Sequence, residues 1–255
     1  MIASYRSHAR AGARMVREAR TTPVAAMSLL AVLYACGIAG SLYLLDAPAG
    51  VAPVATLTFT IGTGIALGSL RARYPHRSLG ACNAVTLLRL ALTAILAAAI
   101  LAPGWAVERP DVLFAIAATA LALDGLDGWL ARRTGLCSDF GARFDMETDA
   151  ALAAMLALIA IRAGVGGPAA LPSLLVLGFT RYAFVLAAGL VPRLRADLPE
   201  RRSRKVVCVI QIGTLAALLP PLLAGRPAAG LALAAAGLLL WSFGRDILWL
   251  LRRRE

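Results

Sequence analysis

Long apolar runs alternate with short polar segments along the whole chain. Each run holds about 20 residues, which is enough for an α-helix to cross the hydrocarbon core of a bilayer. Hydrophobic residues make up 60% of the 255 residues and the mean hydropathy is +0.75, whereas a soluble domain is about 45–50% apolar. The pattern therefore predicts an all-α, polytopic membrane helix bundle. The expected spans are 24–46, 51–70, 84–103, 112–131, 146–164, 171–192, 206–223 and 228–250.

The charges follow the same alternation. The chain carries 26 Lys and Arg against 14 Asp and Glu, a formal net charge of +12. Most basic residues fall in one set of alternating segments, and the opposite loops hold only Arg109, Arg162 and Arg226. This asymmetry matches the positive-inside rule and predicts that both termini are cytoplasmic. The basic excess therefore indicates topology, with a secondary attraction to anionic headgroups, and not a nucleic-acid partner. We expect a bacterial inner (cytoplasmic) membrane protein.

The first 70 residues differ from the rest, because their two expected spans contain no intramembrane charge that suggests chemistry. Residues 1–22 place arginines at spacings of three and four, which form one basic stripe on a helix. This cytoplasmic segment is either a helix lying along the inner leaflet or a disordered tail that sets topology. Residues 23–70 are expected to form an accessory transmembrane hairpin. The six remaining spans form a core over 80–251, followed by a basic cytoplasmic tail, 252–255.

Four aspartates at fixed intervals are the strongest chemical signal. Asp124 and Asp127 are three apart at the end of one expected span, and Asp145 and Asp149 are four apart at the start of the next. Residues at these spacings share a helix face, and the loop between the spans lets the two pairs face each other. Clustered carboxylates repel without cations, and hard oxygen ligands suit Mg²⁺ or Mn²⁺. The spacing predicts a two-metal site for displacement at phosphorus.

The residues around these aspartates resemble a family signature. It is that of the CDP-alcohol phosphotransferases (CDP-alcohol phosphatidyltransferases), matched at every fixed position by Asp124-x2-Asp127-Gly128-x2-Ala131-Arg132-x8-Gly141-x3-Asp145-x3-Asp149. The segment with Asn83, Thr86 and Arg89 is similar to the stretch that opens the family's first core helix, although Cys82 stands where Pro is usual. The resemblance covers about residues 80–251. It implies a six-helix catalytic core, here preceded by two extra transmembrane helices.

The resemblance also implies an activity and roles for residues. The family transfers a phosphoalcohol group from a CDP-linked donor to an acceptor hydroxyl and releases CMP. Asp124, Asp127, Asp145 and Asp149 are then expected to hold two Mg²⁺ ions, with Mn²⁺ as a substitute, and Asp149 to act as general base. The expected donor is CDP-diacylglycerol, and members of the family tend to be homodimers. The residues expected to accommodate CDP are Asn83, Thr86, Gly128, Ala131, Arg132 and Gly141.

Basic residues near the last spans are candidates for binding an acceptor phosphate. They are Arg181, Arg204, Lys205 and Arg245. The alternative is pairing within the protein or with headgroups, because an intramembrane arginine normally needs a partner. Arg245 is not expected to pair with Asp246, since adjacent helical residues do not face each other. The basic character favours a phosphorylated acceptor such as glycerol 3-phosphate, with inositol phosphate or another alcohol as alternatives.

Other polar residues are expected to have supporting roles. Arg89 falls within a span and is a candidate counter-charge for the aspartates. Asp139 and Glu147 lie off both aspartate stripes and are not expected to be metal ligands. The four cysteines form no CxxC pair, and small apolar filler is the expected role for them.

Three other functions fit parts of the pattern. A CDP-choline or CDP-ethanolamine phosphotransferase, which acts on a lipid alcohol, would use the same metal site. A divalent-cation transporter needs carboxylates near mid-membrane with an outward path, whereas all four aspartates lie toward one side; a membrane scaffold does not need them at all. The prediction is therefore an enzyme of phospholipid biosynthesis that transfers a phosphatidyl group.

Overall fold

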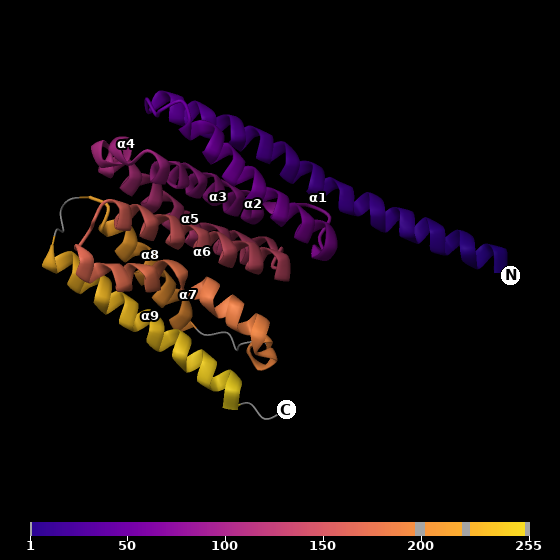
Figure 1. Ribbon diagram of the computed structural model, residues 1–255. Helices are drawn as coiled ribbons and strands as arrows, with labels where there is room; N and C mark the ends of the chain where they lie inside the picture. Colours follow the sequence, from indigo (N-terminus) through magenta and orange to yellow (C-terminus); the bar gives the residue numbers. More distant parts are fainter. Residues whose placement is uncertain (1, 197–201, 221–224, 253–255) are drawn as a thin grey trace.

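The computed structural model describes residues 2–196, 202–220 and 225–252, and for 2–22 and 202 only the backbone. Over these residues the regular structure is helical, as predicted (Figure 1). The α-helices are α1 (Ile2–Leu44), α2 (Val51–Arg73), α3 (Gly80–Leu101), α4 (Pro103–Glu108), α5 (Pro110–Thr134), α6 (Asp139–Arg162), α7 (Leu171–Leu190), α8 (Arg202–Ala217) and α9 (Arg226–Arg252). Two short 3₁₀ turns, η1 (Pro168–Ala170) and η2 (Pro192–Arg195), flank α7.

Six segments in the described part of the chain are long and apolar enough to cross a membrane, so this is an integral membrane protein. They are Pro23–Leu44, Val51–Arg73, Gly80–Leu101, Pro110–Thr134, Pro168–Leu190 and Arg226–Arg252. The expected spans 146–164 and 206–223 are not among these six, but both contain helix. Helix α6 carries several acidic residues in its first turns, and the described part of α8 is 16 residues long.

The N-terminal helix is continuous across an expected boundary. α1 runs from Ile2 to Leu44 with Pro23 inside it, although an interior proline removes one backbone hydrogen bond. The backbone of residues 2–22 in the basic segment therefore continues into the first span. The side chains of the basic stripe and residues 253–255 of the tail lie outside the described residues, so their placement at the leaflet stays a prediction.

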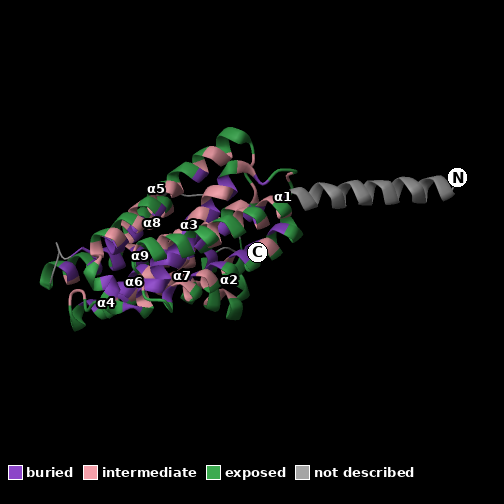
Figure 2. Ribbon diagram, turned by 90° about the horizontal axis from the view of Figure 1, so that it is seen from above, coloured by how far each residue is buried: buried purple, intermediate pink, exposed green. Residues whose placement is uncertain are grey.

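Helix α3 is the centre of the bundle. It packs against α1 and α2 on one side and against α5 and α6 on the other. Its most apolar 18-residue window is 67% buried, against 11% for Pro23–Leu44, and Figure 2 shows the buried positions concentrated in the interior of the bundle. Helices α7, α8 and α9 complete the core beyond α6. The hairpin α1–α2 is therefore peripheral, and α3 and α6 form the interior.

Small residues set the spacing between α6 and α7. A Cβ atom added to Gly178 would lie 2.6 Å from the Cβ of Ala157 and 3.5 Å from the Cα of Ala154. Only a glycine fits at this crossing without a shift of the helices, as is usual where membrane helices approach closely. This contact positions α7 beside the helix that carries two of the four aspartates.

Candidate active site

The turn between α5 and α6 brings the two aspartate pairs together. Helix α5 ends at Thr134, and its C-cap Gly135 has φ +69°, a left-handed conformation that glycine adopts without strain. The N–H of Leu136 then donates to the carbonyl of Ala131 at 3.1 Å. Ser138 caps α6, because its side chain accepts a hydrogen bond from the N–H of Gly141 at 3.1 Å. The chain thus reverses within a few residues.

All four aspartates contact one guanidinium, that of Arg89 on α3. Its Nη1 lies 2.9 Å from Oδ2 of Asp127 and also contacts Oδ1 of Asp145. Its Nη2 lies 3.1 Å from Oδ1 of Asp124 and also contacts Oδ1 of Asp149. Arg89 is fully buried, and its Nε donates to the carbonyl of Ala120 at 3.1 Å. The counter-charge expected of Arg89 is therefore observed, and it joins α3 to both aspartate helices.

Three of the aspartates also satisfy the geometry of a metal site. One carboxylate oxygen from each of Asp124, Asp127 and Asp145 lies within 4.8 Å of the others. The donor set consists of hard oxygen atoms, which suits Mg²⁺ or Mn²⁺. Asp149 lies outside this group of three, although it shares the Nη2 of Arg89 with Asp124. The residues present fit a divalent ion, and the set of four ligands stays a prediction.

Thr86 holds the most buried of these aspartates. Its hydroxyl lies 3.0 Å from Oδ2 of Asp127 and 3.1 Å from the carbonyl of Cys82. Asp127 is only 4% exposed, so the hydroxyl and Arg89 together satisfy a carboxylate that has almost no access to solvent. Thr86, expected to contact CDP, therefore lies directly behind the acidic cluster.

Asn83 and Gly141 are packed against each other. The Asn83 amide donates to the hydroxyl of Tyr74 at 3.1 Å and to the carbonyl of Leu79 at 2.6 Å. A Cβ atom added to Gly141 would lie 3.3 Å from both Oδ1 of Asn83 and Oγ of Ser138. The glycine thus lets α6 approach α3, which is a packing reason for its small size besides the predicted role in accommodating CDP.

Arg132 lies back along the aspartate face of α5. A Cβ atom on Gly128 would be 3.4 Å from Nη1 of Arg132, so the guanidinium rests over the glycine one turn earlier. Ala131 is half-buried and Arg132 is exposed. The guanidinium therefore lies beside Gly128, the residue that follows Asp127, and remains accessible from outside the bundle.

The candidates for acceptor binding fall in two places. Nη2 of Arg181 pairs with Oε1 of Glu147 at 2.6 Å, which links α7 to α6. Nε of Arg204 lies 3.6 Å from Oδ2 of the buried Asp246. Lys205 is exposed on α8. Internal pairing, the stated alternative to phosphate binding, is thus observed for both Arg181 and Arg204.

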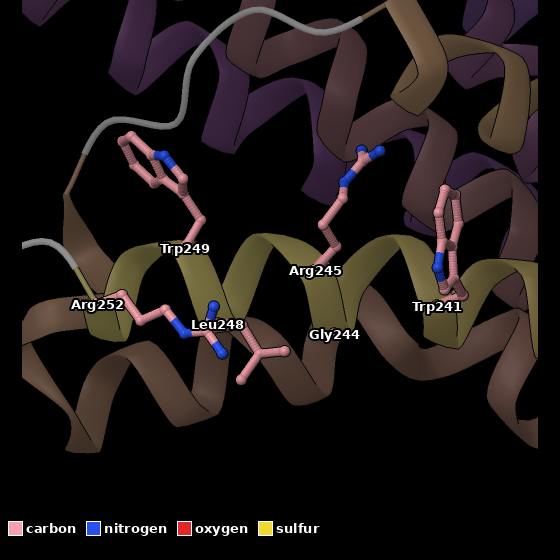
Figure 3. Close-up of a pocket in the computed structure, with 6 residues that line it drawn as sticks. All are labelled: Trp241, Gly244, Arg245, Leu248, Trp249 and Arg252. Carbon is pink, nitrogen blue, oxygen red and sulfur yellow. The ribbon is translucent and has the colours of Figure 1, made fainter.

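Arg245 contacts its neighbour after all. Its Nε lies 3.8 Å from Oδ1 of Asp246, so the expectation that adjacent residues do not meet was wrong. Its long side chain turns toward α8, where Nη2 donates to Oγ of Ser203 at 3.0 Å. Figure 3 shows Arg245 in a groove along α9, pointing toward the neighbouring helices. The groove is lined by Trp241, Gly244, Arg245, Leu248, Trp249 and Arg252.

Two residues with hydrogen bonds at the site, Cys208 and Tyr74, were missed by sequence reasoning. Cys208 on α8 donates its thiol hydrogen to Oδ2 of Asp149, with 3.4 Å between sulfur and oxygen, a polar contact that the role of apolar filler does not predict. Tyr74 anchors Asn83 and also donates toward the carbonyls of Ser78 and Leu79. Neither residue lies in the signature. Cys208 is 59 positions from its partner, and no local spacing indicates such a contact.

The fold and the site define an integral membrane helix bundle in which carboxylates from the consecutive helices α5 and α6 meet around the guanidinium of Arg89. The family described as CDP-alcohol phosphatidyltransferase has a model that matches residues 80–242, and the chain belongs to this family. It is therefore a transferase of substituted phosphate groups, and the family uses a CDP-alcohol donor, an alcohol acceptor and a divalent metal. Helices α1 and α2 lie outside the matched range. Comparisons with curated proteins and with solved structures returned no match.

Proposed function

We propose that the protein transfers the phosphatidyl group of CDP-diacylglycerol to glycerol 3-phosphate in a Mg²⁺-dependent reaction of phospholipid biosynthesis, releasing CMP. The observation that carries this proposal is the convergence of Asp124, Asp127, Asp145 and Asp149 on Arg89. Burying four neighbouring carboxylates in a membrane protein costs free energy. Binding the divalent ions needed to act on a CDP-linked substrate gives these carboxylates a function.

The carboxylates of Asp124, Asp127, Asp145 and Asp149 would hold the divalent ions. When bound, the ions supply charge stabilisation for the pyrophosphate and the leaving CMP. Asp149 accepts the proton of the acceptor hydroxyl, and the acceptor oxygen forms a bond to the phosphorus that carries diacylglycerol. The bond from that phosphorus to the bridging oxygen breaks, and CMP leaves with the bonding electrons. Arg89 keeps the four carboxylates together throughout.

The donor's CDP group is assigned to the face of α5 and α6 beyond the aspartates. Gly128, Ala131 and Gly141 leave room against the two helices, and Arg132 offsets the charge of the pyrophosphate. Asn83 and Thr86 support this face from α3 through their contacts with Leu79 and Asp127. The exposure of Arg132 supports its role, because an incoming anion can reach it.

The acceptor phosphate is assigned to the basic residues of α7, α8 and α9. Arg204 and Arg245 both lie near the buried Asp246, and Arg204 is one helical turn from Cys208, which contacts Asp149. Arg204 is therefore near the proposed base. Arg181 and Lys205 complete the set.

We place the site on the cytoplasmic side of a bacterial inner membrane and expect a homodimer. The distribution of arginines supports this orientation through the positive-inside rule. Residues 1–22 are then a basic cytoplasmic segment, 23–70 an accessory hairpin and 80–251 the catalytic core. The peripheral position of α1 and α2 in the bundle supports this division.

The test is CMP release by the purified protein with CDP-diacylglycerol and one acceptor at a time, in Mg²⁺ and in EDTA. We expect release with glycerol 3-phosphate and none in EDTA. Release only with inositol phosphate, inositol, serine or choline would replace the proposed acceptor. Release only from CDP-choline or CDP-ethanolamine with diacylglycerol would reverse which substrate carries the lipid. A folded protein that releases no CMP with any pair would contradict the proposal and favour a transporter or scaffold.

The assignment of the acceptor site has its own test. Arg204→Gln is expected to raise the KM for glycerol 3-phosphate by roughly tenfold or more, because a charge-assisted hydrogen bond contributes about 1.5–3 kcal/mol. The matched control is Arg226→Gln, an exposed arginine at the start of α9, which should leave the KM unchanged. An unchanged KM in both variants would remove Arg204 from the acceptor site.

A further inference from the structure

The two oxygens of Asp149 are held from two different helices. Oδ1 contacts Nη2 of Arg89 on α3, and Oδ2 accepts the thiol hydrogen of Cys208 on α8 at 3.4 Å. A carboxylate held at one oxygen still rotates about its last bond, whereas one held at both has a defined plane. Cys208 is therefore placed to set the orientation of Asp149.

Helix α8 is itself fixed at this position. Ile212 and Leu215 are four and seven residues after Cys208 on the same helix face, and both are buried. Gln211, three residues after the cysteine, donates its amide to the carbonyl of Leu177 on α7. The face that carries Cys208 is thus packed into the core, so the thiol meets Asp149 from a rigid helix.

We propose that Cys208 is a positioning residue for the transfer reaction, which orients Asp149 both as a base and as a metal ligand. This inference rests on the proposed function of Asp149. Partners that hold a ligand from outside the metal site typically change metal affinity or activity by about 10- to 100-fold when removed. A thiol is a weak donor, so an effect near the lower limit is expected.

The test compares Cys208→Ala with Cys208→Ser, because serine keeps a donor at this position and alanine does not. We expect Cys208→Ala to lower kcat about tenfold with little change in KM for either substrate. Cys208→Ser should restore kcat to within about threefold of the original protein. If the cysteine were only apolar filler, alanine would be tolerated and serine, a polar group in an apolar place, would be the worse variant. That order would overturn the proposal.

A second readout does not require turnover. The Mg²⁺ concentration that gives half of the maximal rise in melting temperature should increase several-fold in Cys208→Ala and return in Cys208→Ser. Cys82→Ala is the matched control: Cys82 is buried on α3, whereas Cys208 is half-buried, and no hydrogen bond between the Cys82 thiol and an aspartate is seen among the described residues. If the melting temperature depended equally on Mg²⁺ in the original protein and in the Cys208→Ala, Cys208→Ser and Cys82→Ala variants, the positioning of Asp149 by Cys208 would be contradicted.

The two readouts separate this inference from the proposed function. An original protein that releases no CMP with any substrate pair refutes the proposed function, while the melting experiment still tests the contact between Cys208 and Asp149. An active protein in which Cys208→Ala keeps full kcat and unchanged Mg²⁺ dependence refutes the inference alone.

Discussion

The guanidinium of Arg89 on α3 forms an ion pair with Asp149 on α6, inside the helix bundle. The same group contacts the three other aspartates. Arg89 is fully buried, and a buried charge is costly unless it is paired. The arginine and the acidic cluster therefore stabilise each other in the bundle. Helix α3, which carries no signature aspartate, holds α5 and α6 together through Arg89.

Replacing Arg89 tests this dependence. Arg89→Gln leaves four neighbouring carboxylates without their shared cation, and we expect the free energy of unfolding in EDTA to fall by about 3–5 kcal/mol. Mg²⁺ should raise the melting temperature more in the variant than in the original protein, because the ion then supplies the missing positive charge. Thermal unfolding in detergent, with EDTA and with Mg²⁺, measures both effects. A variant as stable as the original protein in EDTA would show that the ion pairs do not stabilise the bundle.

Removing one carboxylate tests the metal site. Asp145→Ala is expected to lower turnover by about 100-fold or more, because removal of one stabilising group in a polar active site has an effect of that size. Membrane insertion should persist, since the change takes a charged group out of a helix end. The control is Asp139→Ala, in the same helix but off the aspartate face. CMP release and the amount of membrane-inserted protein are the measurements, and near-normal turnover of Asp145→Ala would refute the two-metal hypothesis.

The close contact of α6 and α7 gives a prediction about stability. Gly178→Ala places a Cβ atom 2.6 Å from that of Ala157, and overpacking of this kind costs about 1–3 kcal/mol. The displacement of α7 from α6 that the added carbon requires should also weaken the ion pair between Arg181 and Glu147, which bridges the same two helices. Gly189→Ala, on the same helix with no atom within 4 Å of the added carbon, should be neutral or stabilising. A lower melting temperature for Gly178→Ala but not for Gly189→Ala would show that packing between the helices, and not the intrinsic helix preference of alanine over glycine, determines the effect.

Tyr74 gives a prediction about pH. Burial raises the pKa of its phenol from 10.0 to about 12, because the charged phenolate is disfavoured away from water. A group whose pKa is higher in the folded state contributes stability that is complete below its unfolded pKa and is lost as pH rises through the folded value. Stability should therefore fall between about pH 10 and pH 12.

The matched variant for this effect is Tyr74→Phe, which keeps the ring that packs edge-on against Phe140 and removes the hydroxyl. At neutral pH we expect the substitution to lower the free energy of unfolding by about 1–2 kcal/mol, because the hydrogen bonds of the hydroxyl to Asn83 and to two carbonyls are lost. The difference in unfolding free energy between the two proteins should shrink above pH 10. A constant difference up to pH 12 would show that Tyr74 does not titrate in this range.

Properties that depend on residues close along the chain could be predicted from the sequence. The length of the apolar runs predicted the six segments that are long and apolar enough to cross a membrane, although the expected spans 146–164 and 206–223 are not among them. Spacings of three and four placed Asp124 with Asp127, and Asp145 with Asp149, on shared faces. The short connection between these helices was enough to predict that the pairs meet. The signature residues over 124–149 predicted the family for the same reason, because they lie within two consecutive helices.

Which faces of distant helices meet is known from the tertiary structure. The sequence made Arg89 a candidate counter-charge, but the fold alone shows that it contacts all four aspartates, that Cys208 contacts Asp149 and that Arg181 contacts Glu147. Local spacing shows which residues share one helix face, but the rotation and depth of one helix against another depend on packing along their whole length. Small residues such as Gly178 set that packing, and their effect on contacts between helices 30 to 60 residues apart does not follow from a local pattern.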